Sequence, residues 1–259
     1  MNLLGGLGPT IGAIALTLPR LAAAFLVLPL LSAATMPSLV RNSFLVSLAI
    51  LVYPLALGTP APSLQGALWP FLVVKELFIG VCFGFLFGSV FWAVSAAGNL
   101  IDTKVGTNFA AVADPIQGHE TTLTGQLLTQ LVAWLFMASG AFTLFLNLLM
   151  TSYTLWPVAD MLPPLTTATE QLAIREFSSL LTLALMLAAP ALVVASLLDL
   201  SLGLINRYAP QLNVFSLTLS IKAWVATFVV LLSLGTFVDI VTQKLFANRG
   251  ILNLLRQML

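Results

Sequence analysis

Residues 75–88 read Lys-Glu-Leu-Phe-Ile-Gly-Val-Cys-Phe-Gly-Phe-Leu-Phe-Gly, an apolar run that opens with a charged pair. Gly80, Gly84 and Gly88 recur every four residues, so on a helix they form one ridge that carries no side chains. In a membrane, such a ridge lets two helix backbones approach closely. Charged residues at membrane depth need polar partners, because each costs about 2.5–3.5 kcal/mol at a helix centre. The stretch therefore predicts a membrane helix that docks against protein rather than lipid.

The composition is that of a membrane protein. Of 259 residues, 59% are hydrophobic and 7% are charged, whereas about 25% of the residues of a soluble protein are charged. The net charge of +1 gives no indication of a nucleic-acid partner. With Cys82 as the single cysteine, no intramolecular disulfide can form, and we expect no metal site. No lysine or arginine precedes Arg20, so we expect a retained membrane segment at the N-terminus rather than a cleaved signal peptide.

The hydropathy pattern predicts an all-α, multi-pass membrane protein with about six long hydrophobic helices, several of them kinked or broken. Each crossing needs about 17–25 apolar residues. The candidate segments are 10–31, 42–57, 67–100, 123–150, 177–205 and 212–240. No stretch is polar enough for a separate soluble domain, so we expect one membrane-embedded domain over residues 1–259.

Two polar connections separate these segments. Residues 99–122 mix charged side chains with small and apolar ones, which is compatible with either a short interfacial helix or a re-entrant element lining a cavity. Residues 151–176 contain several prolines and a threonine-rich patch, and we expect an exposed loop there.

Five charged residues fall within apolar segments: Arg20, Lys75, Glu76, Asp199 and Lys222. We expect structural pairing among them, with a proton relay as the alternative. Lys75 and Glu76 are adjacent and point about 100° apart on a helix, so each is expected to reach a different neighbour.

The last two segments carry polar patterns of their own. Ser196, Asp199, Gly203 and Asn206 recur at helical spacing, which indicates an interface or a wet cavity along one helix face. In residues 213–222, apolar and polar side chains alternate, a period typical of a strand. Because a lone strand in lipid leaves its backbone unpaired, we expect an irregular or helical segment instead.

The sequence gives no indication of catalysis. The single histidine, His119, lies in a polar connection, and Asp199 lacks a second intramembrane aspartate for an aspartyl protease. Phosphate-binding and dinucleotide-binding motifs are also missing. We therefore expect no catalytic residue, cofactor or metal, and no enzyme.

An ordered series of short motifs points to a family. It comprises Leu18-Pro19-Arg20, Met36-Pro37-Ser38-Leu39-Val40-Arg41, Lys75-Glu76-Leu77-Phe78-Ile79-Gly80, Ala97-Gly98-Asn99-Leu100-Ile101-Asp102, Asp114-Pro115, Trp156-Pro157, Asn206-Arg207-Tyr208-Ala209-Pro210 and Ile221-Lys222. In this order the chain resembles the FliR/SctT family, the export-apparatus subunits of flagellar and injectisome type III secretion systems.

The resemblance implies a structural and gating subunit of an export gate in the bacterial inner membrane. It implies helical hairpins in a pseudo-symmetric assembly, with an N-terminal part over residues 1–176 and a C-terminal helix pair over 177–259. Unfolded secreted proteins would pass through the channel of this gate. The implied partners are SctR/FliP-like and SctS/FliQ-like small membrane proteins, with the large SctV/FlhA-like protein and the SctU/FlhB-like switch protein.

The resemblance also implies roles for particular residues. A loop near 102–121 would plug the closed channel, with Gly106, Phe109, Asp114 and Pro115 as its marker residues. The expected subunit-interface or buried-charge residues are Arg20, Lys75, Glu76, Gly80, Gly84, Gly88, Asp199, Asn206, Arg207 and Lys222.

Two alternatives stay open. The motifs favour the injectisome branch over the flagellar one. A secondary transporter of small solutes or ions, with the buried charges as coupling sites, is the rival from a different class. The lack of a convincing internal repeat weakens that rival.

Overall fold

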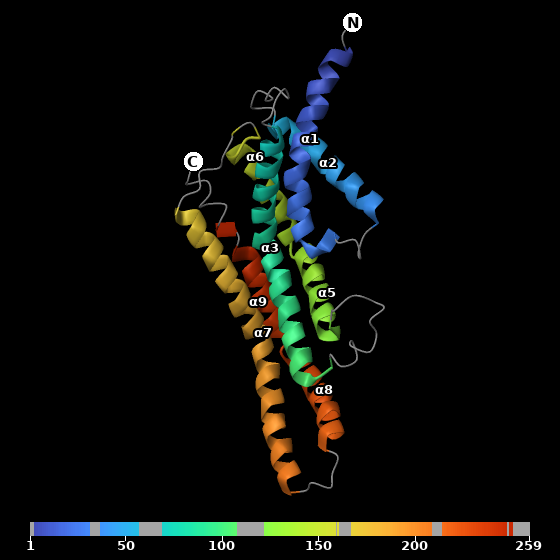
Figure 1. The fold of residues 1–259 in the computed structure, drawn as a ribbon, viewed down its shortest axis with the longest axis vertical. Helices are drawn as coiled ribbons and strands as arrows, with labels where there is room; N and C mark the ends of the chain where they lie inside the picture. Colours follow the sequence, from blue (N-terminus) through green and yellow to red (C-terminus); the bar gives the residue numbers. More distant parts are fainter. Residues whose placement is uncertain are drawn as a thin grey trace. The chain divides into compact units, whose positions relative to one another are not determined.

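The protein is helical throughout the part that the structure describes. The computed structural model describes residues 3–31, 37–56, 69–107, 122–158, 160, 167–208, 214–247 and 249–250, and these contain no strand (Figure 1). The elements are α1 (Leu3–Val27), η1 (Pro29–Leu31), α2 (Ser38–Ala56), α3 (Trp69–Val105), α5 (Leu123–Ala138), α6 (Ala141–Leu155), α7 (Thr167–Tyr208), α8 (Val214–Leu232) and α9 (Leu234–Ala247). The predicted all-α class is confirmed.

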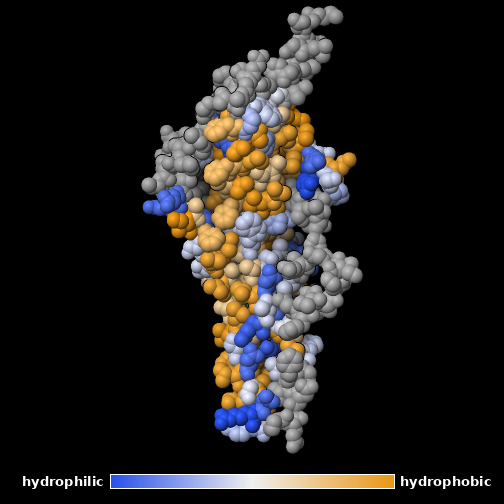
Figure 2. Space-filling model, in the orientation of Figure 1, coloured by the Kyte–Doolittle hydropathy of each residue, from blue (hydrophilic) through white to orange (hydrophobic). Residues whose placement is uncertain are grey.

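The helices differ in their ability to cross a membrane. Trp69–Val105 and Ala173–Tyr208 are each long and apolar enough, and two bent pairs, α5 with α6 and α8 with α9, bring the number of possible spans to four. The apolar helices Ile14–Val27 and Ser38–Pro54 are shorter. Within the described residues, the six expected crossings are thus reduced to between two and four. Hydrophobic side chains cover much of the face drawn in Figure 2, and hydrophilic ones gather in separate patches.

One segment differs from the expected connections, and a second is helical, which is one of the two forms expected for it. Helix α3 continues without a break to Val105, so residues 99–105 are helical rather than part of a loop. Residues 214–222 belong to α8 and are helical despite their alternating pattern. In a helix every backbone group finds its partner within the segment, which lipid requires, and this outweighs the strand-like alternation.

The chain divides into two compact units. The first comprises the described residues within Met1–Ser89, Ser139–Arg175 and Leu245–Leu259. In it α1 packs on α2, and α2 packs on α6. Edge-to-face contacts join Phe25 to Phe145 at 5.2 Å and Phe87 to Phe145 at 5.3 Å between ring centroids, an arrangement that adds stability beyond area burial.

The second unit comprises the described residues within Val90–Ala138 and Glu176–Lys244. Its core is built largely of small side chains on α3, α7 and α8, which let the helix backbones lie close together. The buried members are Ala97, Ile101, Val105, Ala188, Ala191 and Ala226.

Local backbone chemistry explains where two helices are interrupted. Gly140, just before α6, has φ +82°, a left-handed conformation that glycine adopts without steric cost. Between α8 and α9 the chain bends by 55° at Ser233. The Ser233 amide still bonds to the Val229 carbonyl at 3.0 Å, so this break leaves few backbone groups unpaired.

Candidate functional site

The glycine ridge of α3 lies against α1. A Cβ atom added at Gly84 would stand 2.6 Å from the Ala24 carbonyl oxygen, and one added at Gly88 would stand 3.0 Å from the Val27 oxygen. A side chain at Gly80 would overlap the Arg20 carbonyl. The ridge does meet protein, as expected, and the protein that it meets here is the chain's own first helix.

This close approach brings Arg20 of α1 onto Glu76 of α3. The guanidinium donates from Nε to Glu76 Oε2 at 2.7 Å and from Nη2 to Oε1 at 2.9 Å, and both side chains are fully buried. Such two-point pairs are the strongest form of charge-assisted hydrogen bonding.

Further donors of Arg20 bind α6 and the residue that follows it. Nη1 donates to Ser152 Oγ at 3.0 Å, and Nη2 also donates to the Trp156 carbonyl at 2.9 Å. The Tyr153 ring lies over the guanidinium at 4.1 Å from its centroid, and its hydroxyl donates to the Thr17 carbonyl at 2.8 Å. Arg20 therefore joins α1, α3 and the end of α6 in the first unit.

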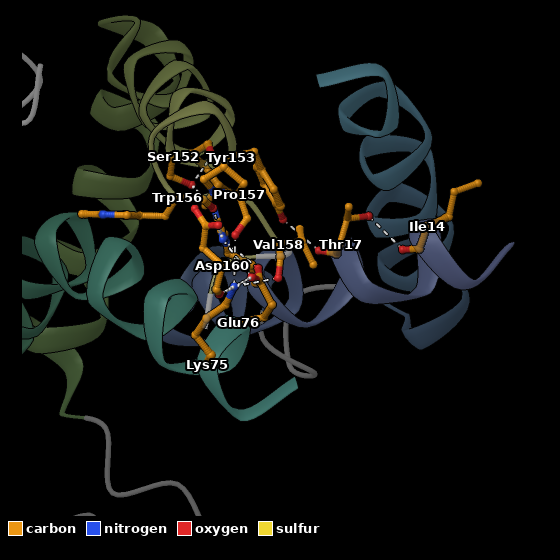
Figure 3. Close-up of polar contacts among 12 residues, drawn as sticks. Ile14, Thr17, Lys75, Glu76, Ser152, Tyr153, Trp156, Pro157, Val158 and Asp160 are labelled. Carbon is orange, nitrogen blue, oxygen red and sulfur yellow. Dashed lines mark hydrogen bonds and ion pairs between the residues drawn. The ribbon is translucent and has the colours of Figure 1, made fainter. Parts of the chain in front are cut away.

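Lys75 completes this buried cluster. Its ammonium lies 2.9 Å from Glu76 Oε1 and donates to the carbonyls of Pro157 at 3.2 Å, Val158 at 2.9 Å and Asp160 at 2.8 Å (Figure 3). Each residue reaches a different neighbour, as expected, Glu76 binding Arg20 and Lys75 binding the carbonyls after α6, but the two also pair with each other. The flexible four-carbon stem of lysine lets its head group bridge the 100° between adjacent helix positions.

The connection that follows α6 also differs from the exposed loop that the sequence predicts. Residues 151–176 were expected to form an exposed loop, but α6 continues to Leu155, and Val158 beyond it is buried. Backbone carbonyls of this connection bind Arg20 and Lys75. Every residue has a backbone carbonyl, so the sequence does not indicate which carbonyls bind a cation. Their role follows only from the positions of Arg20 and Lys75 beside them.

The electrostatic balance of the cluster involves the end of α6. Arg20 and Lys75 carry two positive charges against the single carboxylate of Glu76, which leaves a formal excess of one. The C-terminal end of a helix carries partial negative charge on its free carbonyls. The carbonyls that follow α6 thus offset the excess, and each of the three charges has protein partners.

A second charge cluster lies in the second unit. Asp199 of α7 pairs with Lys222 of α8 at 2.9 Å and with Lys104 of α3 at 3.0 Å. The side chains of Asp199 and Lys104 are each 36% exposed, so this pairing is more accessible than that around Glu76. Lys104 was missed as a partner because its segment was expected to be a loop.

Asp102 joins the end of α3 to the start of α5. Its carboxylate accepts the Thr124 amide at 2.9 Å and the Thr124 hydroxyl at 2.6 Å. Free amides at a helix N-terminus need such acceptors. Nearby, the Thr122 hydroxyl bonds to Asn99 Oδ1 at 2.8 Å. The sequence placed Asp102 in the connection without indicating this role.

The remaining predicted residues are placed as follows. Gly106 ends α3 with φ +92°, which suits glycine. Phe109, Asp114 and Pro115 lie outside the described residues.

Asn206 and Arg207 are exposed in the last turn of α7, and the structure brings neither of them into a charge cluster. Ser196 and Gly203 are exposed on the same helix.

The two charge clusters hold helices of the chain against one another. Among the described residues, no group of three or more His, Cys, Asp or Glu side chains could hold a metal ion. The three buried charges around Glu76 are held by side chains and backbone carbonyls of the chain itself. Apolar helices joined by charges that are paired within the chain define a multi-pass membrane protein.

The comparisons with known proteins agree with this class. The model of bacterial export proteins, family 1, matches residues 11–247, and the chain belongs to this family. It is 37% identical over 213 residues to Yop proteins translocation protein T of Yersinia pestis, covering 82% of each chain. It is 33% identical over 222 residues to the surface presentation of antigens protein SpaR of Salmonella typhimurium, covering 84% of this chain and 81% of that one.

A flagellar relative is less similar. The flagellar biosynthetic protein FliR of Bacillus subtilis is 28% identical over 232 residues, with 88% of each chain covered. The chain is thus a membrane component of the type III secretion export apparatus, located in the inner membrane among the other components of that apparatus, and not an enzyme.

Proposed function

We propose that the chain is a structural and gating subunit of the export gate and forms part of the channel through which unfolded proteins cross the inner membrane. The surface of α7 is the observation that carries this proposal. An 18-residue apolar stretch within its span Ala173–Tyr208 is only 28% buried within the chain. The span exposes polar positions, Ser196 and Asn206 among them. Lipid offers such groups no hydrogen bonds, so partner subunits are the better cover.

The proposed partners are the SctR/FliP-like and SctS/FliQ-like membrane proteins, joined by SctV/FlhA-like and SctU/FlhB-like components. In this arrangement residues 1–176 form the N-terminal part and 177–259 the C-terminal helix pair. Extraction of the tagged chain in mild detergent, followed by mass spectrometry of the high-molecular-weight fraction, tests it. We expect two small polytopic proteins to co-migrate with the chain. Recovery as a lone monomer contradicts the proposal.

The injectisome is the proposed branch. The 37% and 33% identities to the translocation and antigen-presentation proteins, against 28% to the flagellar protein, support it. The same mass spectrometry identifies the co-migrating partners and so decides between injectisome and flagellum.

Deletion of residues 108–113 tests the proposed channel plug. Val105 belongs to the buried core of the second unit, so the deletion starts beyond it. We expect an intact complex whose membrane conducts ions in the resting state, measured as loss of membrane potential. Deletion of residues 61–66, an equally long stretch of another connection, serves as the control. An intact complex with unchanged conductance rules out the plug assignment.

The rival transporter function gains no support from the charges around Glu76. A coupling site exchanges its ion or proton during transport, which requires access from outside. Arg20 and Glu76 have no exposed side-chain surface, and their donors and acceptors are occupied by one another and by neighbouring groups.

A further inference from the structure

The head group of Lys75 sits in a cage of four oxygen atoms. Three are backbone carbonyls, from Pro157, Val158 and Asp160, and the fourth is Oε1 of Glu76, all within 2.8–3.2 Å of Nζ. The side chain is only 4% exposed. Figure 3 shows Lys75 beside Glu76 of the same helix and beside Pro157, Val158 and Asp160 of the connection that follows α6.

The cage matches the chemistry of a primary ammonium group. An ammonium carries three N–H donors and no acceptor, so a ring of oxygens satisfies it fully. In return, the carbonyl of the buried residue Val158 obtains a donor in a place where water is largely excluded. Arg20 does not supply this donor, because its nitrogens already bind Glu76, Ser152 and Trp156.

We infer that Lys75 is a positioning residue that acts as a built-in cation, and that the oxygen cage around it is a binding site for a small primary ammonium ion once the lysine is shortened. The lysine fastens the connection after α6 to α3 through backbone atoms. The position of Pro157, Val158 and Asp160 therefore depends on a positive charge that can donate hydrogen bonds.

Chemical rescue of a Lys75→Ala variant tests this site. The substitution removes a three-carbon ammonium group, and n-propylammonium has the same length and the same three donors. Hydrogen exchange of the full chain in lipid nanodiscs reports on the amides of Trp156 and Asp160, which bond to Ser152 and Pro157 in the intact connection. We expect about tenfold faster exchange of these amides in the variant and recovery of most of the protection with n-propylammonium.

Three controls separate the site from general stabilisation. Tetramethylammonium at equal ionic strength has the charge but no N–H donors, and it should rescue nothing. Lys75→Met fills the volume without a charge and should show the fast exchange in the presence and absence of the amine. Lys104→Ala removes a lysine that pairs with Asp199 in the other unit and should leave residues 152–160 unchanged.

Several results overturn the inference. They are protection in Lys75→Met equal to that of the unmodified chain, equal rescue by the two ammonium ions, and no rescue by n-propylammonium. If Lys75→Ala does not fold, the amide exchange rates of Lys75→Met decide whether Lys75 acts through its charge or only through its volume. If the side chain only fills space, Lys75→Met should keep the protection of the unmodified chain.

Discussion

Glu76→Gln should destabilise the chain more than any other single substitution of its charged residues. The amide keeps the shape of the carboxylate but removes the negative charge that pairs with Arg20 and Lys75, both of which lie within 2.9 Å of Glu76. Removing one partner from a buried ion pair costs about 3–5 kcal/mol, because the other charge is left uncompensated. Thermal unfolding in detergent should show a clear loss of stability, and the steady-state amount of protein in the membrane should fall with it.

Glu170→Gln is the matched control, because Glu170 is an exposed glutamate near the start of α7. Its stability should stay close to that of the unmodified chain. A double-mutant cycle adds a second measurement. In an Arg20→Met background, Glu76→Gln should lower the free energy of unfolding much less, because it leaves one cation without its carboxylate instead of two. Equal costs in the two backgrounds would mean that the pair does not hold α1 and α3 together.

Gly84→Leu should separate α1 from α3. Any Cβ atom at this position would lie 2.6 Å from the Ala24 carbonyl oxygen and 2.9 Å from Val27 Cβ, so the leucine cannot fit unless the helices move apart. Overpacking typically costs about 1–3 kcal/mol. The cost should be higher here, because the obstacle is backbone and because Arg20 would be drawn away from Glu76. Proteolytic sensitivity in detergent and secretion by the complemented strain measure the two consequences.

Gly203→Leu provides the control for that substitution. Among the described residues, no atom of a neighbouring element lies within 4 Å of the position that a Cβ would occupy at Gly203, and leucine is the better helix former. The isolated chain should therefore stay as stable as before. If Gly84→Leu and Gly203→Leu behave alike in detergent, the glycine ridge is not a close helix contact.

The parts of this architecture that depend on hydropathy and helical spacing could be predicted from the sequence. The all-helical class follows from the apolar segments, and the close packing of α3 follows from the four-residue spacing of Gly80, Gly84 and Gly88. Pairing among the charges of the apolar segments was expected, because unpaired charges are expensive at membrane depth, and Arg20 does pair with Glu76. The partner itself lies 56 residues away in sequence, and no local pattern identifies it.

What could not be predicted involves the backbone and the lengths of helices. The carbonyls of Pro157 and Val158 bind Lys75 whatever their side chains are, so residue types give no signal. The extension of α3 to Val105 was hidden because Asp102 and Lys104 made its last turn look like a polar connection. Only their partners, Thr124 and Asp199, explain why these charges are tolerated at the end of an apolar helix.

The contact between Lys75 and the connection after α6 also bears on which substitutions this chain can accept. On one side is a single side chain that supplies both charge and donors, and on the other are main-chain oxygens that every amino acid possesses. Asp160, whose own side chain is exposed, could be exchanged for most residues without weakening the contact, whereas position 75 has no equivalent substitute. In a saturation mutagenesis scan scored by secretion, position 160 should therefore tolerate most substitutions and position 75 few, although the two residues contribute to the same hydrogen bond.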